Sequence, residues 1–285
     1  MPNIFGKLWN SAPKHWFPAL KRRMLRRPIW DWDYSLQGIL SRRNHLQPAT
    51  LIDRWHRYWR VIEMHTPYKR LENFNFEGRV VVELGCGPLL GWGPMAIFLG
   101  ADKFIYEEPW LKRDVLFTDE IRELYLRPLF DELTANFGAR QTFEIFLEKV
   151  LNSGSMPSTE DDRVDIIISN STLEHIPKED LSILLLKYRQ LCSEEAVYLH
   201  AVDFSDHQSR EKGFGDMYEG PNRPRHGLNF LRKPDLEDVI RESGFSNYSS
   251  MVYRSSSASP SHPDWDCYEI ADLEARVVLF IGSIS

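Results

Sequence analysis

The sequence predicts an α/β protein whose core is a mostly parallel, doubly wound sheet with helices on both faces. Short β-branched runs alternate with longer segments of helical periodicity, an order typical of parallel sheets. The loop "ELGCGPLLG", residues 83–91, directly follows the end of the first run. Two late runs without a helix between them predict an antiparallel hairpin at one sheet edge. Ligands of such sheets bind where the strand order reverses, at the carboxyl ends of the strands.

The first half of the chain contains the unit built around the glycines. Apolar residues at helical spacing predict a helix within residues 51–68, leading into the main domain at Phe76. The expected strands are residues 80–84 and 103–106, and the expected helices are residues 92–99, closed by Gly100, and 119–136. Residues 142–146 fit a third strand and equally the start of a helix.

The second half continues the alternation. We expect strands at residues 164–169 and 196–202 and helices at residues 177–192 and 233–245, each of which opens with a proline near its start. The polar segment 204–230 is long enough to predict a functional or disordered connection. The two late strands are expected at residues 247–254 and 275–281, on either side of a serine-rich loop.

Length and composition predict an ordinary globular protein. The chain has 285 residues, of which 42% are hydrophobic and 27% charged. No apolar run approaches the roughly 18 residues of a membrane span, and no signal peptide is recognisable. The three cysteines are widely spaced and form no CxxC pair, so we expect neither a disulfide framework nor a zinc site. These features predict a cytoplasmic protein.

Charge is distributed unevenly along the chain. Residues 1–60 contain 12 Lys or Arg and three Asp, a balance of +9. Because the net charge of the whole chain is −6, residues 61–285 carry a balance of −15. We therefore predict a basic, aromatic-rich helical extension at residues 1–70 and a main domain at residues 71–285. The interleaved arginines and aromatics of residues 13–30 suit peripheral contact with the inner membrane face. They equally suit a solvated arm packed on the acidic body, whereas nucleic acid is disfavoured as a partner.

The glycine loop and the acid after it predict a nucleoside-containing ligand. Gly85 and Gly87 permit a tight turn and a close approach of ligand to backbone, and Glu107 and Glu108 end the second strand, where an acid can bind ribose hydroxyls. A dinucleotide and S-adenosylmethionine both fit this order of elements. Glu83 favours S-adenosylmethionine because it can face an ammonium group, and Pro88 removes an amide that a pyrophosphate could use.

The segments "VVELGCGP", "GADKFIYEEP" and "VDIIISNSTLEHI" together resemble the class I S-adenosylmethionine-dependent methyltransferases. The resemblance covers roughly residues 76–281 and implies a seven-stranded sheet with a C-terminal antiparallel hairpin. It implies that the cofactor S-adenosyl-L-methionine is bound by Glu83, Gly85, Cys86, Gly87, Pro88, Glu108, Asn170 and Ser171. Glu107 is the alternative to Glu108 as the ribose acid. Residues 140–163 depart from the pattern, so no adenine-contacting acid is assigned.

Candidate catalytic residues follow the expected fourth and fifth strands of the family pattern. His175 and His207 are potential general bases because a histidine titrates near neutral pH, and Asp203 can orient a histidine or the acceptor. His175 can instead brace its loop, and Asp203 can serve turn chemistry. A divalent metal site at the end of the fifth strand is the less favoured alternative, because no further ligand cluster stands out; no metal ligand is assigned. The motif "SNST", residues 169–172, differs from the motif that the resemblance associates with methylation of nucleobase nitrogens.

The acceptor is predicted from a weaker resemblance over about 45 residues. "AVDFSDH", followed by Asn229, Leu231, Arg232 and Asp235, resembles bacterial methyltransferases associated with surface polysaccharide or glycolipid synthesis. This implies O-methylation of a sugar hydroxyl. The alternatives are a small natural product or a protein side chain as acceptor, and a non-catalytic methyltransferase-like scaffold. A dehydrogenase is a further alternative.

Overall fold

The computed structural model describes residues 33–65, 74–154, 163–207, 214, 218 and 228–284. At its centre is a six-stranded sheet with the strand order β2-β1-β3-β4-β6-β5. The strands are β1 (Val80–Leu84), β2 (Lys103–Glu107), β3 (Val164–Asn170), β4 (Cys192–Asp203), β5 (Ser246–Ser255) and β6 (Ala275–Ser283). β1 to β4 are parallel, whereas β6 is antiparallel to both β4 and β5. The described residues thus confirm the mostly parallel sheet and its antiparallel C-terminal strands.

The predicted seventh strand is not confirmed. Residues 142–146, which fitted a strand or a helix, belong to helix α9 (Phe143–Leu151), which begins where the Thr142 side chain accepts a hydrogen bond from the Ile145 amide. A helix forms here rather than a strand because Phe143, Phe146 and Val150 recur at helical spacing and are all buried. At the free edge of β2, Gly154 forms a single parallel bridge with Ile105. The residues that follow, 155–162, lie outside the described part of the chain.

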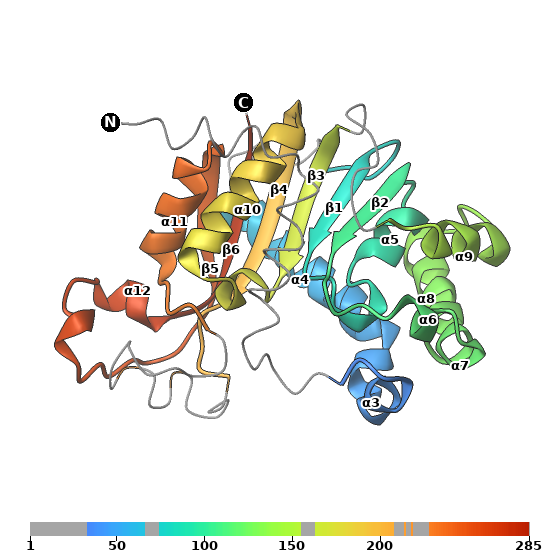
Figure 1. Cartoon of the computed structure of the whole chain (residues 1–285), viewed down its shortest axis with the longest axis horizontal. Helices are drawn as coiled ribbons and strands as arrows, with labels where there is room; N and C mark the ends of the chain where they lie inside the picture. Colours follow the sequence, from blue (N-terminus) through green and yellow to red (C-terminus); the bar gives the residue numbers. More distant parts are fainter. Residues whose placement is uncertain are drawn as a thin grey trace.

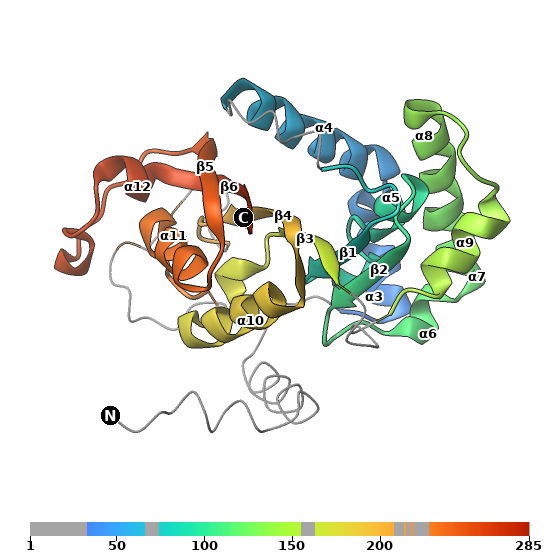
Figure 2. The same cartoon turned by 90° about the horizontal axis from the view of Figure 1, so that it is seen from above.

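Helices cover both faces of the sheet, because successive side chains of a strand point to opposite faces. Val81 and Ile168 belong to the core on one face, and Val82 and Ile167 to the core on the other. Helices α10 (Lys178–Leu191) and α11 (Lys233–Glu242) lie in front of the sheet in Figure 1. Figure 2 shows α4 (Pro48–His65) on the opposite side. The remaining helices with buried residues in the first core are α3 (Leu36–Ser41), α5 (Gly93–Phe98), α6 (Arg113–Leu116), α7 (Asp119–Ile121), α8 (Arg127–Phe137) and α9.

Helix α4 belongs to the predicted N-terminal extension and packs into the core of the main domain. Trp55, Tyr58 and Ile62 are buried there, and the Trp55 ring lies 5.2 Å from that of Trp92. The division at residue 70 stays a prediction, as does membrane contact through residues 13–30, which lie outside the described residues. Among the helices that the structure describes, none combines the length and the apolarity needed to cross a membrane.

The strand order reverses between β1 and β3. From β1 the chain passes to β2 on one side, and then returns to β3 on the other side of β1. This is the switch point of a doubly wound sheet, where the loops at the carboxyl ends of the two strands diverge and leave a crevice. The short helix α12 (Ile270–Glu274) lies between β5 and β6, where the sequence pattern predicted only a loop.

Candidate functional site

A cavity of about 630 Å³ lies at the carboxyl ends of β1, β2, β3 and β4. Every residue that the sequence singles out for cofactor binding or catalysis lines it. These residues are Glu83, Gly85, Cys86, Gly87, Pro88, Glu108, Asn170, Ser171, His175, Asp203 and His207. The structure therefore brings the predicted residues together at the switch point, although their chemical roles stay predictions.

The glycine loop after β1 packs closely against its surroundings. Gly85 has a φ of +68° and Gly91 a φ of +51°, values that residues other than glycine rarely adopt. A Cβ atom on Gly85 would lie 2.3 Å from the Thr172 side chain, and one on Gly91 would lie 2.2 Å from Oε1 of Glu83. Thr172 in turn donates a hydrogen bond from Oγ1 to the Gly85 carbonyl at 3.2 Å. Glycine is required here because an acid and a threonine occupy the space of a side chain.

Glu83 is a buried acid beneath this loop. Its side chain is 2% exposed, and its Oε2 accepts a hydrogen bond from the Trp92 amide at 2.8 Å. Burial raises its pKa to about 8, despite the hydrogen bonds that it accepts from backbone amides. No basic side chain in the described ranges forms an ion pair with it. A cationic group on a ligand in the cavity would compensate this buried carboxylate.

The two acids after β2 have different surroundings. Glu107 accepts hydrogen bonds from Lys187 Nζ at 3.0 Å and from the Tyr188 hydroxyl, both on α10. Glu108 instead accepts hydrogen bonds from the amides of Gly87, at 3.0 Å, and Trp110, at 3.2 Å. Glu108 therefore lies over the glycine loop, whereas Glu107 is engaged with α10. This difference favours Glu108 as the acid that meets a ligand, although both residues line the cavity.

Cys86 and Pro88 belong to the glycine loop, which lines the cavity together with Glu83 and Glu108. Cys86 is buried, and its burial raises the pKa of its thiol well above the ordinary value. Pro88 lies in the 3₁₀ turn η4 (Gly87–Leu89). This turn brings the loop back to Glu83, so both residues shape the wall of the cavity rather than offer a reactive group.

The end of β3 connects the loop with α4. The Tyr58 hydroxyl donates a hydrogen bond to Asn170 Oδ1 at 3.1 Å. Ser171 has a φ of +52°, which is strained for a residue with a side chain. Backbone strain of this kind is often found at functional sites, where surrounding contacts hold it in place. Here the Ser171 amide is held by the Ala201 carbonyl at 2.8 Å.

The two candidate histidines lie beside each other on loops that follow neighbouring strands. His175 ends the 3₁₀ turn η6 (Leu173–His175) after β3, and His207 follows β4. Their ring centroids are 5.1 Å apart. His207 Nε2 lies 3.8 Å from Asp203 Oδ2. Burial alone would raise the pKa of Asp203, but hydrogen bonds from His207 and Ser205 outweigh it and lower the value to about 2. Asp203 is therefore ionised at neutral pH and can orient His207.

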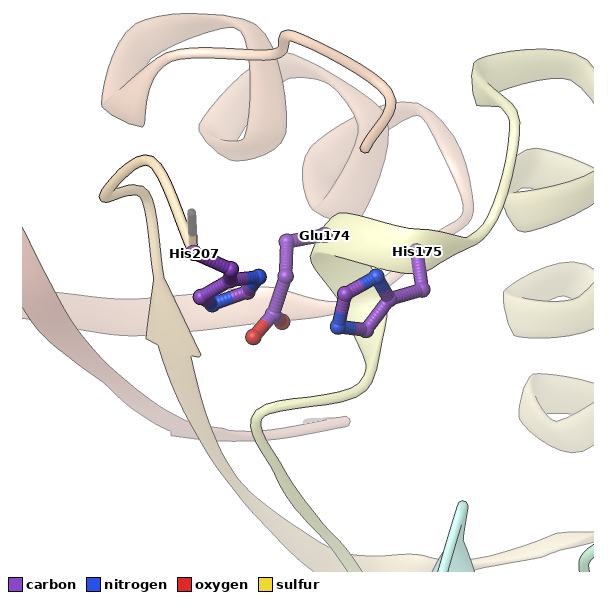
Figure 3. A group of neighbouring side chains, drawn as sticks. All are labelled: Glu174, His175 and His207. Atoms are coloured by element: carbon purple, nitrogen blue, oxygen red, sulfur yellow. The ribbon is translucent and has the colours of Figure 1, made fainter. Parts of the chain in front are cut away.

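Glu174 is a site residue that the sequence analysis did not select. It is 3% exposed, and its carboxylate lies between the two imidazole rings in Figure 3. One oxygen accepts a hydrogen bond from the Asp203 amide at 3.4 Å, whereas Oε2 has no hydrogen-bond donor among the described residues. Ligand atoms of Glu174, His175 and His207 all lie within 4.8 Å of one another. The motif "LEH" contained the signal, because an acid beside a histidine after a strand is a potential ligand pair.

Two tyrosines that line the cavity carried no signal in the sequence. Tyr34, from the segment before α3, shares a hydrogen bond with Glu108. Tyr125 reaches the cavity from a π-helical turn, η5 (Arg122–Leu126), which interrupts the helix between α7 and α8. The position of both tyrosines at the cavity depends on packing between segments that are far apart in sequence.

Several solved structures that resemble the chain are methyltransferases at low sequence identity. A putative methyltransferase in complex with the Trm112 activator, from Haloferax volcanii, is 10% identical, with a TM-score of 0.40, over 83% of this chain and 93% of that one. An S-adenosylmethionine-dependent methyltransferase from Mesorhizobium loti is 13% identical, with a TM-score of 0.38, over 79% of this chain and 96% of that one.

A third similar structure is that of the magnesium protoporphyrin IX methyltransferase from Synechocystis PCC 6803 with bound SAH. It is 11% identical, with a TM-score of 0.38, over 85% of this chain and 99% of that one. No protein-family model and no curated protein sequence matches the chain.

Proposed function

We propose that the chain transfers a methyl group from S-adenosylmethionine to a hydroxyl oxygen of an acceptor. The observation that carries the proposal is the two-part lining of one cavity. Acids and glycines at the ends of β1 and β2 suit a cationic nucleoside ligand, and two histidines at the ends of β3 and β4 suit the removal of a proton. The two parts lie at the switch point, where doubly wound sheets bind ligands.

The acids fit the charges and hydroxyls of the cofactor. Glu83 is buried without a cationic partner in the described ranges, so an ammonium group would satisfy it. Glu108 already accepts hydrogen bonds from backbone amides above the loop, and ribose hydroxyls can donate to the same carboxylate. Close packing of the loop on Thr172 and Glu83 fixes its backbone, which a ligand can then approach closely.

The chain's own residues supply orientation and a base. S-adenosylmethionine, when bound, provides a methyl group that is already activated on a sulfonium. His207 or His175 then takes the proton of the acceptor hydroxyl, and Asp203 orients His207 across the 3.8 Å that separates them. A positioned base is worth a factor of roughly 10² to 10⁴ in rate.

For the acceptor itself we propose a sugar hydroxyl of a glycan or glycolipid. Support comes from the residue pattern after β4, which resembles methyltransferases of surface polysaccharide synthesis. The same residues also have structural contacts, since Asn229 Nδ2 donates to the carbonyls of Leu173 and Ile176 at 2.8 and 2.7 Å. Small natural products and protein side chains therefore belong in the same acceptor screen.

Calorimetric titration with S-adenosylmethionine and S-adenosylhomocysteine tests the cofactor. We expect wild type and Glu148→Ala, a control at an exposed position on α9, to bind alike. Glu108→Ala should bind at least tenfold more weakly, a loss of about 1.4 kcal/mol. An absence of binding by wild type at millimolar ligand would overturn the proposal, and binding of NADH instead would favour a dehydrogenase.

A further inference from the structure

Three potential metal ligands meet beside the cavity, and the two histidines among them line it. Glu174 and His175 come from η6, after β3, and His207 comes from the loop after β4. Their ligand atoms lie within 4.8 Å of one another, and Figure 3 shows the carboxylate between the two rings. Ligands at about 2.1 Å from one cation lie roughly 3.0–3.4 Å apart, so side-chain rotation must shorten even the widest of these separations by no more than roughly 1.4–1.8 Å.

The backbone around these ligands is already held in place. The carbonyl of Glu174 accepts a hydrogen bond from the Asn229 amide at 2.8 Å. Asn229 Nδ2 binds the carbonyls on either side of the turn, those of Leu173 and Ile176. Beside the third ligand, Asp203 Oδ2 lies 3.8 Å from His207 Nε2, where it can orient the ring. Metal sites use partners of this kind to fix the orientation of a ligating histidine.

The buried acid lacks compensation in the described part of the chain. Glu174 Oε2 is buried and has no hydrogen-bond donor among the described residues. A buried polar oxygen without a donor destabilises the folded state, and a cation bound to the carboxylate removes that cost.

We propose that Glu174, His175 and His207 together bind one divalent transition-metal cation. Two imidazole nitrogens and one carboxylate suit Zn²⁺, Mn²⁺ or Fe²⁺, whereas Mg²⁺ and Ca²⁺ prefer oxygen ligands. Three protein ligands leave coordination positions open. Since His175 and His207 line the cavity, those positions face the space where an acceptor would lie.

The role of the cation, though not its binding, rests on the proposed function. With the histidines as ligands, the cation replaces them in activating the acceptor hydroxyl. A hydroxyl bound to the cation has a lowered pKa and loses its proton to water. Its oxygen then forms the bond to the methyl carbon as the carbon–sulfur bond breaks and its electron pair returns to sulfur.

Metal binding is tested on full-length protein after removal of bound metal with EDTA and desalting. Titrations use Zn²⁺, Mn²⁺ and Mg²⁺ salts alone. We expect one equivalent of Zn²⁺ or Mn²⁺ per chain and at least tenfold weaker Mg²⁺ binding. His56→Gln, at an exposed position of α4, is the matched control and should bind like wild type.

Each of Glu174→Gln, His175→Gln and His207→Gln should weaken binding at least tenfold. Circular dichroism shows whether the buried Glu174→Gln variant folds, and the half-buried His207→Gln variant tests the site if it does not. Absorption of bound Co²⁺ gives a second readout, because its visible spectrum reports the ligand set. Equal affinity in wild type and His207→Gln, or no binding by wild type, would overturn the site.

Failure of the cation site and failure of the proposed function give different results. If the protein binds metal but not S-adenosylmethionine, the cation site is supported and the proposed methyltransferase function is overturned. If the protein binds S-adenosylmethionine and EDTA does not reduce methyl transfer, the catalytic role of the cation is overturned. The histidines then act as bases, as in the proposed function.

Discussion

Gly91 shows how a single residue determines the shape of the glycine loop at the cavity. A Cβ atom at this position would lie 2.2 Å from the buried Glu83 carboxylate, and φ is +51°. Gly78 has a similar φ of +67° but open space around its Cβ position. Comparing the two positions separates the cost of the backbone conformation from the cost of the close contact.

We expect Gly91→Ala to destabilise the protein more than Gly78→Ala. The positive φ should cost roughly 1–2 kcal/mol in both variants, and displacement of Glu83 should add roughly 1–3 kcal/mol in Gly91→Ala. Urea denaturation measures both free energies of unfolding. Equal losses would show that Glu83 moves aside freely and that the loop does not hold it.

At the residue scale, the sequence selected the cavity lining at the ends of β1 and β2 more completely than the residues at the ends of β3 and β4. Glu83, the glycines and Glu108 are adjacent to a strand–loop–helix pattern, and local order is enough to place them. Glu174 was overlooked because its importance depends on His207, 33 positions along the chain on another strand end. Its neighbour in the motif, His175, was selected because histidine has a recognisable chemistry by itself.

Arg232 has a structural function at the scale of elements. Its side chain is fully buried, and its guanidinium donates hydrogen bonds to the carbonyls of Phe204, at 3.0 Å, and Ala275, at 2.9 Å. It also lies over the ring of Phe214, 5.3 Å from the centroid. One residue thus connects the start of α11 with the end of β4 and the start of β6.

We predict that Arg232→Lys destabilises the protein by about 2–4 kcal/mol, because one ammonium cannot reach every carbonyl and leaves buried acceptors unpaired. Arg241→Lys, at an exposed position of the same helix, should change the free energy of unfolding by less than about 0.5 kcal/mol. Thermal and urea denaturation of both variants measure the difference. Similar values for the two would contradict the role of Arg232 in joining these elements.

Element types followed from periodicity, but their irregularities did not. The helix expected at residues 119–136 exists, yet it contains the π-helical turn η5 just before Pro128. A proline lacks the amide that the carbonyl four residues earlier requires, so the hydrogen-bond ladder changes there. Tyr125 lies within this turn and lines the cavity. Burial of two phenylalanines decided that residues 143–151 form a helix.

At the scale of the whole molecule, packing between distant segments completes the site. The helical extension supplies Tyr58, which binds Asn170, and Tyr34, which binds Glu108. The alternation of strands and helices predicted the sheet and its switch point, but not the docking of α4 on one face. That docking buries aromatic residues against Trp92, and its geometry depends on the shapes of both surfaces.

The buried ionisable groups predict how stability of the ligand-free protein depends on pH. His200 is buried and its pKa is lowered to about 3, so the folded state resists protonation that the unfolded state accepts below about pH 6.5. Its contribution therefore weakens as pH falls from about 6.5 towards 3. Glu83 acts in the opposite direction, because its pKa is raised to about 8. Its contribution is full below about pH 4.5 and is lost as pH rises to 8.

The effects of His200 and Glu83 on the free energy of unfolding oppose each other between about pH 4.5 and 6.5. Above pH 6.5, only the loss of stability from Glu83 continues. Glu108 and Glu174, whose pKa values are also raised by burial, act in the same direction as Glu83. We therefore expect the free energy of unfolding to fall between pH 6.5 and 8, with Glu83 alone contributing up to about 1.4 kcal/mol per pH unit. Urea denaturation across this range should show a shallower decline in Glu83→Gln. A wild-type profile that rises towards pH 8 would mean that Glu83 is ionised in the folded state and already has a cationic partner.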